Sequence, residues 1–313
     1  MAKVAFVFPG QGSQAVGMGK DLFEKFPEAR AVFEAADEAL GEKLSTLCFE
    51  GPDTALKLTA NTQPAILTVS VAVHAVFSKR GPAPAFVAGH SLGEYSALVA
   101  AGAMSLADAV RAVRARGTFM QEAVPAGVGA MAAVLGLEPQ KVKAACDAAA
   151  EGQVVAPANY NSPEQTVIAG NAEAVERAGA KCKEAGAKKV MPLPVSAPFH
   201  CGLMDPVKPR LAEVLGGVRV NAPAVPVVTN VEARPNTDAS RVVPLLLEQV
   251  SSPVRWIECV EALKAEGVTR VVELGPGKVL CGLVKRITKD IETFNVEDAA
   301  GLEKVLAALG VSA

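Results

Sequence analysis

The sequence contains few aromatic and few charged residues, and it has no long hydrophobic run. Of its 313 residues, 4% are aromatic and 20% are charged, whereas half are hydrophobic. No apolar stretch reaches the roughly 18 residues that a membrane-spanning helix needs. The formal net charge of −2 also argues against nucleic-acid binding as the main role. We therefore expect a globular protein with a well-buried core that neither spans a membrane nor binds nucleic acid.

Patterns typical of disulfide, zinc and phosphate sites are also missing. The six cysteines are scattered without a C-x-x-C pair, which favours reduced thiols in a cytoplasmic protein over a disulfide framework or a zinc site. The Gly-rich loop at residues 9–14 has neither a GxGxxG pattern nor a GK[ST] ending, so it does not match a phosphate-binding loop. The N-terminal stretch MAKVAFVFPG has one lysine before a strand-like run and is a poor signal peptide. We expect a cytoplasmic location.

Among the patterns that are present, the stretch from Phe86 to Gly102 is the most informative. It reads FVAGHSLGEYSALVAAG: a short apolar run reaches Gly89-His90-Ser91-Leu92-Gly93 and then continues as a helix of small residues. A G-x-S-x-G pattern between a strand and a helix is typical of a nucleophile elbow, whose serine lies on a sharp turn. An ordinary βα turn with a serine helix cap gives the same pattern, so the motif alone leaves both interpretations open.

A second candidate ligand-binding segment follows the strand predicted at residues 3–8. Pro9-Gly10-Gln11-Gly12-Ser13-Gln14 is a strand-to-helix loop of the kind found at the active-site edge of α/β proteins. Its glycines would leave backbone N–H groups and the Gln11 amide free to point at a ligand. A plain tight turn has the same residues, so this interpretation also stays open.

One arginine lies on an otherwise apolar helix face. Ser105 is expected to cap a helix from Leu106 to about Glu122, and at about 100° per residue Arg116 falls within the edge of its apolar stripe. A buried charge is costly unless it has a partner. Arg116 is therefore either paired with a core carboxylate or placed to bind an anionic substrate.

A serine nucleophile needs a base within hydrogen-bonding reach, and only three histidines are available. His90 is next to Ser91, so in an extended strand end its side chain should point the other way. His74 is predicted on a helix without a catalytic partner. His200, in a proline-rich loop, is therefore the strongest candidate base. No carboxylate suits the third position of a triad.

The order of predicted strands and helices in the middle of the chain differs from that in its two ends. There, strands and helices follow the order βαββαβ, which is typical of the split βαβ, ferredoxin-like pattern. The predicted strands are 129–135, 154–159, 165–169 and 188–191, and the predicted helices are about 139–150 and 172–185. We predict a discontinuous large α/β domain, residues 1–124 and 197–313, with a small inserted domain at residues 125–196.

The flanking segments also alternate helices and strands. Besides the elements named above, helices are predicted at about 21–40, 61–79, 204–215, 241–250, 255–266 and 297–309, and strands at 225–229, 270–273 and 291–295. Another helix is expected to open after Gly275-Pro276-Gly277.

Six motifs, taken in order, resemble one known family. They are GQGSQ at residues 10–14, GHSLGE at 89–94, the Arg116 helix, NSPEQTVIAG at 161–170, PVSAPFH at 194–200 and ELGPGKVL at 273–280. The set covers almost the whole chain and resembles the malonyl-CoA:acyl carrier protein transacylases of fatty-acid synthesis. The same motifs mark the acyltransferase domains of polyketide and animal fatty-acid synthases. The resemblance implies a large α/β-hydrolase-like domain with a short parallel sheet and an inserted small ferredoxin-like domain.

The resemblance implies a role for several residues. Ser91 would attack the malonyl thioester, and His200 would take its proton and later activate the incoming thiol. The backbone N–H groups of Gln11 and Leu92 would form the oxyanion hole. In this family a backbone carbonyl typically orients the histidine, and the matching position is Gln249. That would explain the missing acidic third member.

Substrate and partners follow from the same resemblance. Arg116 would hold the free malonyl carboxylate, and Phe199 resembles the version associated with malonyl rather than branched extender units. The substrates would be malonyl-CoA and an acidic, phosphopantetheinylated acyl carrier protein. No metal or cofactor is expected, because the serine, its base and the oxyanion hole suffice. The family is commonly monomeric, and basic docking candidates are Lys188, Lys189, Lys285, Arg286 and Lys289.

Other functional hypotheses stay open at this point. The carrier protein could belong to a polyketide route instead of fatty-acid synthesis. A serine thioesterase or esterase would use the same nucleophile and oxyanion hole, although Arg116 and the missing triad acid argue against it. A non-catalytic binding module would require Ser91 and His200 to be incidental.

Overall fold

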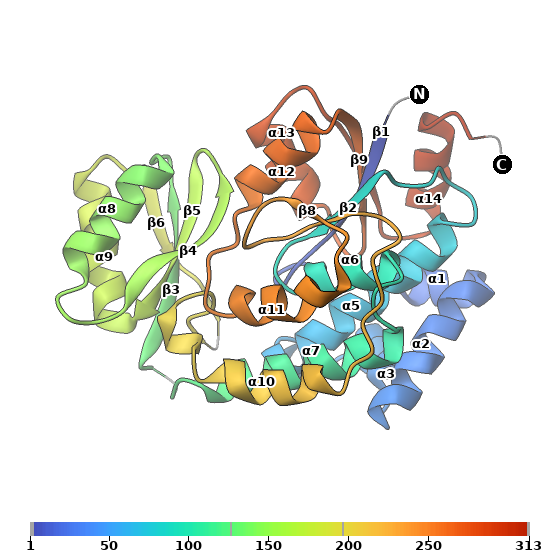
Figure 1. The fold of residues 1–313 in the computed structure, drawn as a ribbon, viewed down its shortest axis with the longest axis horizontal. Helices are drawn as coiled ribbons and strands as arrows, with labels where there is room; N and C mark the ends of the chain where they lie inside the picture. The colour runs from blue at the N-terminus through green and yellow to red at the C-terminus, as the bar shows by residue number, and fades with distance from the viewer. Residues whose placement is uncertain (1–2, 126, 196, 312–313) are drawn as a thin grey trace.

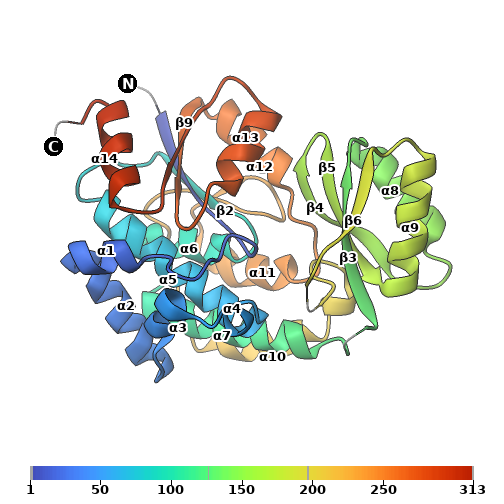
Figure 2. The ribbon, with the colours of Figure 1, turned by 180° about the vertical axis from the view of Figure 1, so that it is seen from behind.

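The fold consists of two β-sheets with helices packed around them (Figure 1). The structure is a computed structural model that describes residues 3–125, 127–195 and 197–311. Ala126 and Ser196, near the two ends of the predicted insert at residues 125–196, lie outside the described residues. The first and last described residues lie on the side of the molecule away from the smaller sheet (Figures 1 and 2).

The larger sheet has six strands in the order β10-β9-β1-β2-β7-β8. Neighbouring strands from β10 to β7 run parallel, and β8 is antiparallel to β7. Both faces of β1 are buried, because Phe6 and Phe8 enter one hydrophobic cluster and Ala5 and Val7 enter another. This is typical of a parallel sheet covered by helices on both sides. The strands are β1 (Lys3–Phe8), β2 (Phe86–Gly89), β7 (Val227–Val228), β8 (Pro235–Asn236), β9 (Val268–Leu274) and β10 (Glu292–Val296).

Helices cover the two faces of this sheet unequally. Among the helices that the structure describes, only α12 and α13 contribute to the cluster that contains Ala5 and Val7, whereas the other helices of this part pack on the opposite side or around its edges. The helices are α1 (Lys20–Lys25), α2 (Pro27–Leu40), α3 (Leu44–Glu50), α4 (Asp53–Leu56), α5 (Thr59–Phe77), α6 (Gly93–Ala100), α7 (Leu106–Glu122), α10 (Val207–Gly216), α11 (Ala239–Gln249), α12 (Trp256–Ala265), α13 (Val279–Ile287) and α14 (Ala299–Ala308), with a short 3₁₀ turn at Gly202–Met204.

The smaller sheet is antiparallel, with the strand order β4-β5-β3-β6. Its outer face is covered by two helices, and its inner face is turned toward the larger sheet (Figures 1 and 2). Along β3, Ala132 and Val134 pack with these two helices, while Met131 and Ala133 join the main core, as the period of two in a strand requires. The elements are β3 (Gly129–Leu135), α8 (Pro139–Ala149), β4 (Val155–Ser162), β5 (Gln165–Asn171), α9 (Ala172–Glu184) and β6 (Lys189–Pro192).

The α/β character predicted from the sequence is confirmed, but some helix predictions are wrong. The helix predicted at 21–40 is divided into α1 and α2, because Phe26 precedes a proline and is extended, with φ −124° and ψ 119°. The helix predicted from Asn61 begins two residues earlier, at Thr59, so Pro64 lies inside α5 and not in its first turn. The short helices α3 and α4 had no counterpart in the prediction.

The cysteines and helices agree with the expectations from composition. All six cysteines are buried and unpaired. No helix in the described part of the chain is both long and apolar enough to cross a bilayer.

Candidate active site

Ser91 lies on a sharp turn between β2 and α6. Its φ is +53°, in the left-handed region that non-glycine residues rarely adopt. The flanking glycines are required by close packing: a Cβ on Gly89 would lie 1.9 Å from the Gly93 carbonyl group, and a Cβ on Gly93 would lie 2.2 Å from Phe8 O. The cap position of α6 belongs to Leu92, and no side chain caps this helix. The alternative of a simple serine-capped turn is therefore wrong.

The side chains of Ser91 and His200 are hydrogen-bonded, with 2.7 Å between Ser91 Oγ and His200 Nε2. His200 Nδ1 lies 2.9 Å from the backbone carbonyl oxygen of Gln249. Because a carbonyl only accepts, Nδ1 carries the proton, and the lone pair of Nε2 faces the Ser91 hydroxyl. Burial, reinforced by the nearby Arg116 charge, lowers the pKa of His200 to about 3, so the imidazole is neutral and able to accept a proton.

The histidine next to Ser91 points elsewhere, as the strand geometry predicted. His90 Nε2 lies 2.8 Å from Asn161 Oδ1, and the His90 ring packs 5.7 Å from that of Trp256. His74 is also away from the site, in edge contact with Phe6 and Phe8. Of the three histidines, His200 is therefore the one that is bonded to Ser91.

Arg116 is 1% exposed and reaches the same serine. Its Nη2 donates to Ser91 Oγ at 3.1 Å and to Gln249 Oε1 at 3.0 Å, and its Nη1 donates to Gln63 Oε1 at 2.7 Å. In the described part of the chain these partners are amides and a hydroxyl, and no carboxylate pairs with Arg116 directly. Of the two interpretations of this residue, direct pairing with a core carboxylate is thus wrong.

A buried carboxylate lies one amide away from Arg116. Glu94, on α6, is 2% exposed, and its Oε2 accepts from Gln249 Nε2 at 2.8 Å and from the backbone N–H of Asn230 at 2.9 Å. Burial raises the pKa of Glu94 to about 7, whereas these two donors and the Arg116 charge act in the opposite direction. The Gln249 side chain is therefore inserted between the acid and the arginine, while its backbone holds His200.

Gln11 and Leu92 both line the pocket that contains Ser91. Gln11 follows the carboxyl end of β1, and Leu92 follows the serine, so strands that are adjacent in the sheet bring them together. Neither backbone N–H donates to another backbone group in the described part of the chain. The Gln11 side chain donates to Thr59 Oγ1 at 3.2 Å, which uses one of the two N–H groups of its amide, and the residue lines the pocket.

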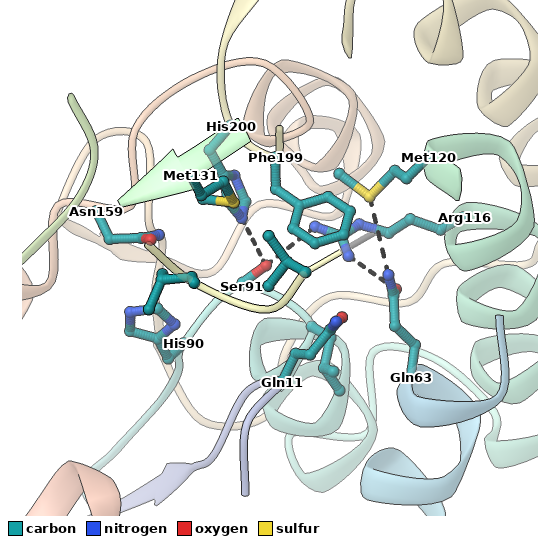
Figure 3. Close-up of a pocket in the computed structure, with 13 residues that line it drawn as sticks. Gln11, Gln63, His90, Ser91, Arg116, Met120, Met131, Asn159, Phe199 and His200 are labelled. Carbon is teal, nitrogen blue, oxygen red and sulfur yellow. Dashed lines mark hydrogen bonds between the residues drawn. The ribbon is translucent and has the colours of Figure 1, made fainter. Parts of the chain in front are cut away.

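The pocket around Ser91 is a small cavity of about 110 Å³ between the two sheets. Figure 3 shows Phe199, Met120 and Arg116 on one side of Ser91, and His90 and Asn159 on the other. The apolar part of the lining comes from α7, β3 and the segment that leads to His200: Met120, Met131, Leu193, Val195 and Phe199.

A second hollow of about 220 Å³ adjoins this pocket and shares part of its wall. The shared residues are Gln11, His90, Asn159 and Leu193. The second hollow extends to Val279, which is 51% exposed at the start of α13. Its polar lining, apart from the shared residues, includes Asn161 and Gln165 from the smaller sheet. The second hollow thus extends the space beside Ser91 toward an exposed residue, with a partly polar lining.

Comparison with known proteins defines the class. The family model described as acyl transferase domain matches residues 5–306. The malonyl CoA-acyl carrier protein transacylase of Escherichia coli strain K12 is 52% identical over 307 residues, covering 98% of this chain and 99% of that protein. The transacylase of the same name from Bacillus subtilis strain 168 is 51% identical over 310 residues, covering 99% of this chain and 98% of that protein.

Solved structures agree with these matches. An acyl carrier protein S-malonyltransferase from Vibrio cholerae superposes with a TM-score of 0.95 at 51% identity, covering 97% of this chain and all of that one. A malonyl-transacylase in complex with a type II PKS acyl-carrier protein superposes with a TM-score of 0.95 at 48% identity, covering 98% of this chain and all of that one. The chain therefore belongs to the acyl transferase domain family and, within it, to the malonyl CoA-acyl carrier protein transacylases.

Three polar residues that bond to the groups around Ser91 were not predicted from the sequence, and neither were the pocket-lining residues Met120, Met131, Asn159, Leu193 and Val195. Gln63 precedes the proline inside α5, Glu94 is the last residue of the GHSLGE motif, and Asn230 follows the two-residue strand β7. Of these three, only Glu94 lay within a recognised motif. Its position at the start of a helix of small residues, which is expected to be buried, was a usable signal. The residues that the resemblance assigned to the site all lie together: Gln11, Ser91, Leu92, Arg116, Phe199 and His200 line the pocket, and Gln249 contacts both Arg116 and His200.

Proposed function

We propose that this protein transfers a malonyl group from malonyl-CoA to the phosphopantetheine thiol of an acyl carrier protein, through a malonyl ester of Ser91. One observation carries the proposal: Ser91 Oγ lies 2.7 Å from a neutral imidazole nitrogen and 3.1 Å from a buried guanidinium. The first contact suits a nucleophile with its base. The second suits an acyl group that ends in a carboxylate.

In the first half-reaction, Ser91 Oγ attacks the thioester carbonyl carbon while His200 Nε2 takes the hydroxyl proton. The negative charge that develops on the carbonyl oxygen faces the N–H groups of Gln11 and Leu92, and losing one such donor typically costs about 3 kcal/mol. The carbon–sulfur bond then breaks, and coenzyme A leaves as a thiol with the proton from His200. The Gln249 carbonyl keeps the imidazole oriented throughout.

In the second half-reaction, the same groups act in reverse order. His200 takes the proton of the carrier-protein thiol, whose sulfur attacks the malonyl ester. The ester bond to Ser91 breaks, and His200 returns the proton to Ser91 Oγ. Because coenzyme A leaves before the carrier-protein thiol attacks the malonyl ester, the reaction is expected to follow ping-pong kinetics, with no metal or cofactor.

Specificity for malonyl is assigned to Arg116. The malonyl carboxylate would take over a guanidinium N–H that now contacts Ser91 Oγ, forming a charge-assisted bond in a buried site. A neutral acyl group leaves this buried donor without a charged partner, which penalises that substrate. Phe199, which lines the pocket beside His200, would limit branched acyl groups by its bulk.

The second hollow offers a path for the pantetheine arm of either thioester. Its polar lining suits amide groups, and its outer end lies beside α13, which carries Lys285 and Arg286 in its last turn. These cations suit an acidic carrier protein. We assign the carrier to fatty-acid synthesis, in line with the Escherichia coli relative; the relative solved with a type II PKS acyl-carrier protein favours a polyketide carrier as the second candidate.

We include the domain organisation, the oligomeric state and the location of the protein in the same proposal. Residues 1–124 and 197–313 form an α/β-hydrolase-like domain, and residues 125–196 form a ferredoxin-like insert, which is supported by the strand order β6-β3-β5-β4 with two helices on one face. The protein works as a monomer in the cytoplasm.

Intact mass spectrometry after mixing with malonyl-CoA tests the function. We expect one malonyl adduct that is stable in water, is released rapidly by an acyl carrier protein thiol and is absent in Ser91→Ala. An adduct that survives Ser91→Ala would refute the nucleophile. Rapid hydrolysis without any dependence on the thiol would identify a thioesterase or esterase instead.

A further inference from the structure

The side chain of Asn230 bridges both arms of the turn that carries Ser91. Its Oδ1 accepts from the backbone N–H of Ser91 at 2.7 Å, and its Nδ2 donates to the backbone carbonyl of Gly89 at 2.7 Å. Asn230 is fully buried, with 0% exposure, and it does not line the pocket. One amide side chain outside the pocket therefore links the end of β2 to the residue that carries the hydroxyl group.

The Ser91 backbone needs this support because of its conformation. Its left-handed φ of +53° is sparsely populated for a residue with a side chain and persists only where the surroundings impose it. The carbonyl oxygens of His90 and Ser91 accept hydrogen bonds from the backbone N–H groups of Gly93 and Glu94, respectively, at the start of α6. The backbone N–H of Ser91, in contrast, donates to the side chain of Asn230.

Asn230 is itself held on more than one side. Its backbone N–H donates to Glu94 Oε2 at 2.9 Å, and its backbone carbonyl accepts from the N–H of Arg255 at 3.2 Å. Since Glu94 belongs to α6, the contacts form a closed ring from Ser91 through Asn230 back to the helix that Ser91 precedes. Such a ring fixes the turn more firmly than either hydrogen bond alone.

We propose that Asn230 is a positioning residue for the nucleophile: it holds the left-handed turn of Ser91 and thereby keeps Ser91 Oγ in line with His200 Nε2. The inference rests on the proposed function only in taking Ser91 as the reacting group. Asn230 acts chiefly through the Ser91 backbone and touches neither Arg116 nor the acyl pocket. Its Oδ1 also accepts one longer bond, of 3.3 Å, from Gln249 Nε2. It sets the reactivity of the serine and leaves the choice of acyl group to other residues.

The test is Asn230→Ala with two readouts. We expect kcat for malonyl transfer to fall about a hundredfold, the effect of a displacement of about 1 Å at the reacting atom. We expect KM for malonyl-CoA and the malonyl-to-acetyl ratio to stay within about twofold of wild type, because the hydrogen bonds of Arg116 are retained. The rate of Ser91 labelling by a neutral fluorophosphonate should fall in parallel with kcat.

Asn236→Ala is the matched control. Asn236 is buried in the same region, and its amide also makes one donor and one acceptor bond to backbone, both with Asp238. Its loss should lower thermal stability without slowing fluorophosphonate labelling of the folded enzyme. If Asn236→Ala slows labelling as much as Asn230→Ala does, the effect is general loosening and the proposal is overturned.

Asn230→Asp provides a second, isosteric variant if the alanine protein does not fold. It keeps an acceptor for the Ser91 N–H but places an oxygen against the Gly89 carbonyl, so we expect slowed labelling here too. Wild-type labelling and kcat in the folded Asp variant would refute the two-sided bridge. Failure of the proposed function has a different signature: wild type would then react with fluorophosphonate but form no malonyl adduct.

Discussion

His200 donates from Nδ1 to the backbone carbonyl of Gln249, 2.9 Å away, and not to a carboxylate. A neutral carbonyl fixes the tautomer of the imidazole but supplies no charge to stabilise a permanent imidazolium. Burial, reinforced by the Arg116 guanidinium, lowers the pKa of His200 to about 3, and the bond to the Gln249 carbonyl opposes this shift only in part. The backbone contact also survives any change of the Gln249 side chain, which allows the two roles of Gln249 to be tested separately.

The kcat/KM for acylation should not fall as the pH drops through 6.5, where an ordinary histidine base would become protonated. The base must be neutral to accept the Ser91 proton, and with a pKa near 3 it stays neutral well below 6.5, the usual histidine value. We expect kcat/KM for malonyl-pantetheine, which has no phosphate, to stay flat from pH 8 through 6.5 and down to about 5. Thiol release measures the rate.

The variant Glu94→Gln distinguishes a pH effect of Glu94 from one of His200 in that experiment. The pKa of Glu94 is about 7, so a limb near pH 7 that vanishes in this variant belongs to Glu94. A limb near 6.5 that remains in both proteins would show that His200 has an unshifted pKa, contrary to the prediction.

Arg116→Ala should lose malonyl transfer selectively. A charge-assisted hydrogen bond in a buried site contributes about 1.5–3 kcal/mol, so kcat/KM for malonyl-CoA should fall about 10- to 100-fold, while that for acetyl-CoA is retained. Arg114→Ala is the control, because Arg114 lies on the same helix but bonds to Asn61 and Glu42 outside the pocket. An unchanged malonyl-to-acetyl ratio would remove Arg116 from acyl selection.

Gln249→Met should separate the side chain of Gln249 from its backbone. The change leaves the carbonyl bonded to His200, so Ser91 labelling by fluorophosphonate should stay within about threefold of wild type. It removes an acceptor from Arg116 and a donor from Glu94, and leaving buried polar groups unpaired costs about 1–3 kcal/mol each. It also removes a donor from the Ser91 carbonyl oxygen, which keeps its bond from the Glu94 N–H. We expect a lower free energy of unfolding in urea and a lower kcat/KM for malonyl-CoA.

Gln63→Met is the comparison for that variant. It removes the other amide acceptor of Arg116 but no partner of Ser91 or Glu94. It should share the loss of malonyl selectivity with a smaller loss of stability. Equal destabilisation by the two changes would show that the Glu94 contact contributes nothing.

Arg286→Glu should weaken use of the carrier protein but not of small thiols. Arg286 is exposed near the end of α13 and donates to Gln165, which lines the second hollow. Reversing its charge should raise KM for an acidic carrier protein about 3- to 10-fold at low ionic strength, with a smaller effect at high salt. Free pantetheine as acceptor should be unaffected. Arg219→Glu, on the exposed segment after α10, should change neither; an equal effect would indicate net charge alone.

The side chains that meet at Ser91 could be located from the sequence because each follows a local rule. A serine between two glycines at a strand end identifies the elbow, a shortage of histidines isolates His200, and helical periodicity isolates Arg116. The same local rules predicted β1, β3 and α7 with the bounds observed. Where the prediction of one helix at 21–40 failed, the physical reason was also local, since Pro27 disfavours a helical conformation at Phe26.

The supporting groups could not be predicted, because their roles depend on contacts distant in sequence. Asn230 meets Ser91 across 139 residues and Gly89 across 141, and an asparagine after a short strand is otherwise an ordinary turn residue. The choice between a paired and an available Arg116 likewise depended on the Gln249 side chain, 133 residues away. Periodicity places a side chain on a buried face but does not identify what it meets there.

Met131 and Phe199 form part of the pocket wall, yet neither contributes a group to the proton transfers. One comes from the inner face of the smaller sheet and the other from the segment returning from it, whereas Ser91, Gln11 and Asn230 follow neighbouring strands of the larger sheet. A substitution at Met131 or Phe199 would therefore reshape the pocket while leaving the side-chain hydrogen bonds that join Ser91 to His200 and Asn230 to the Ser91 turn in place.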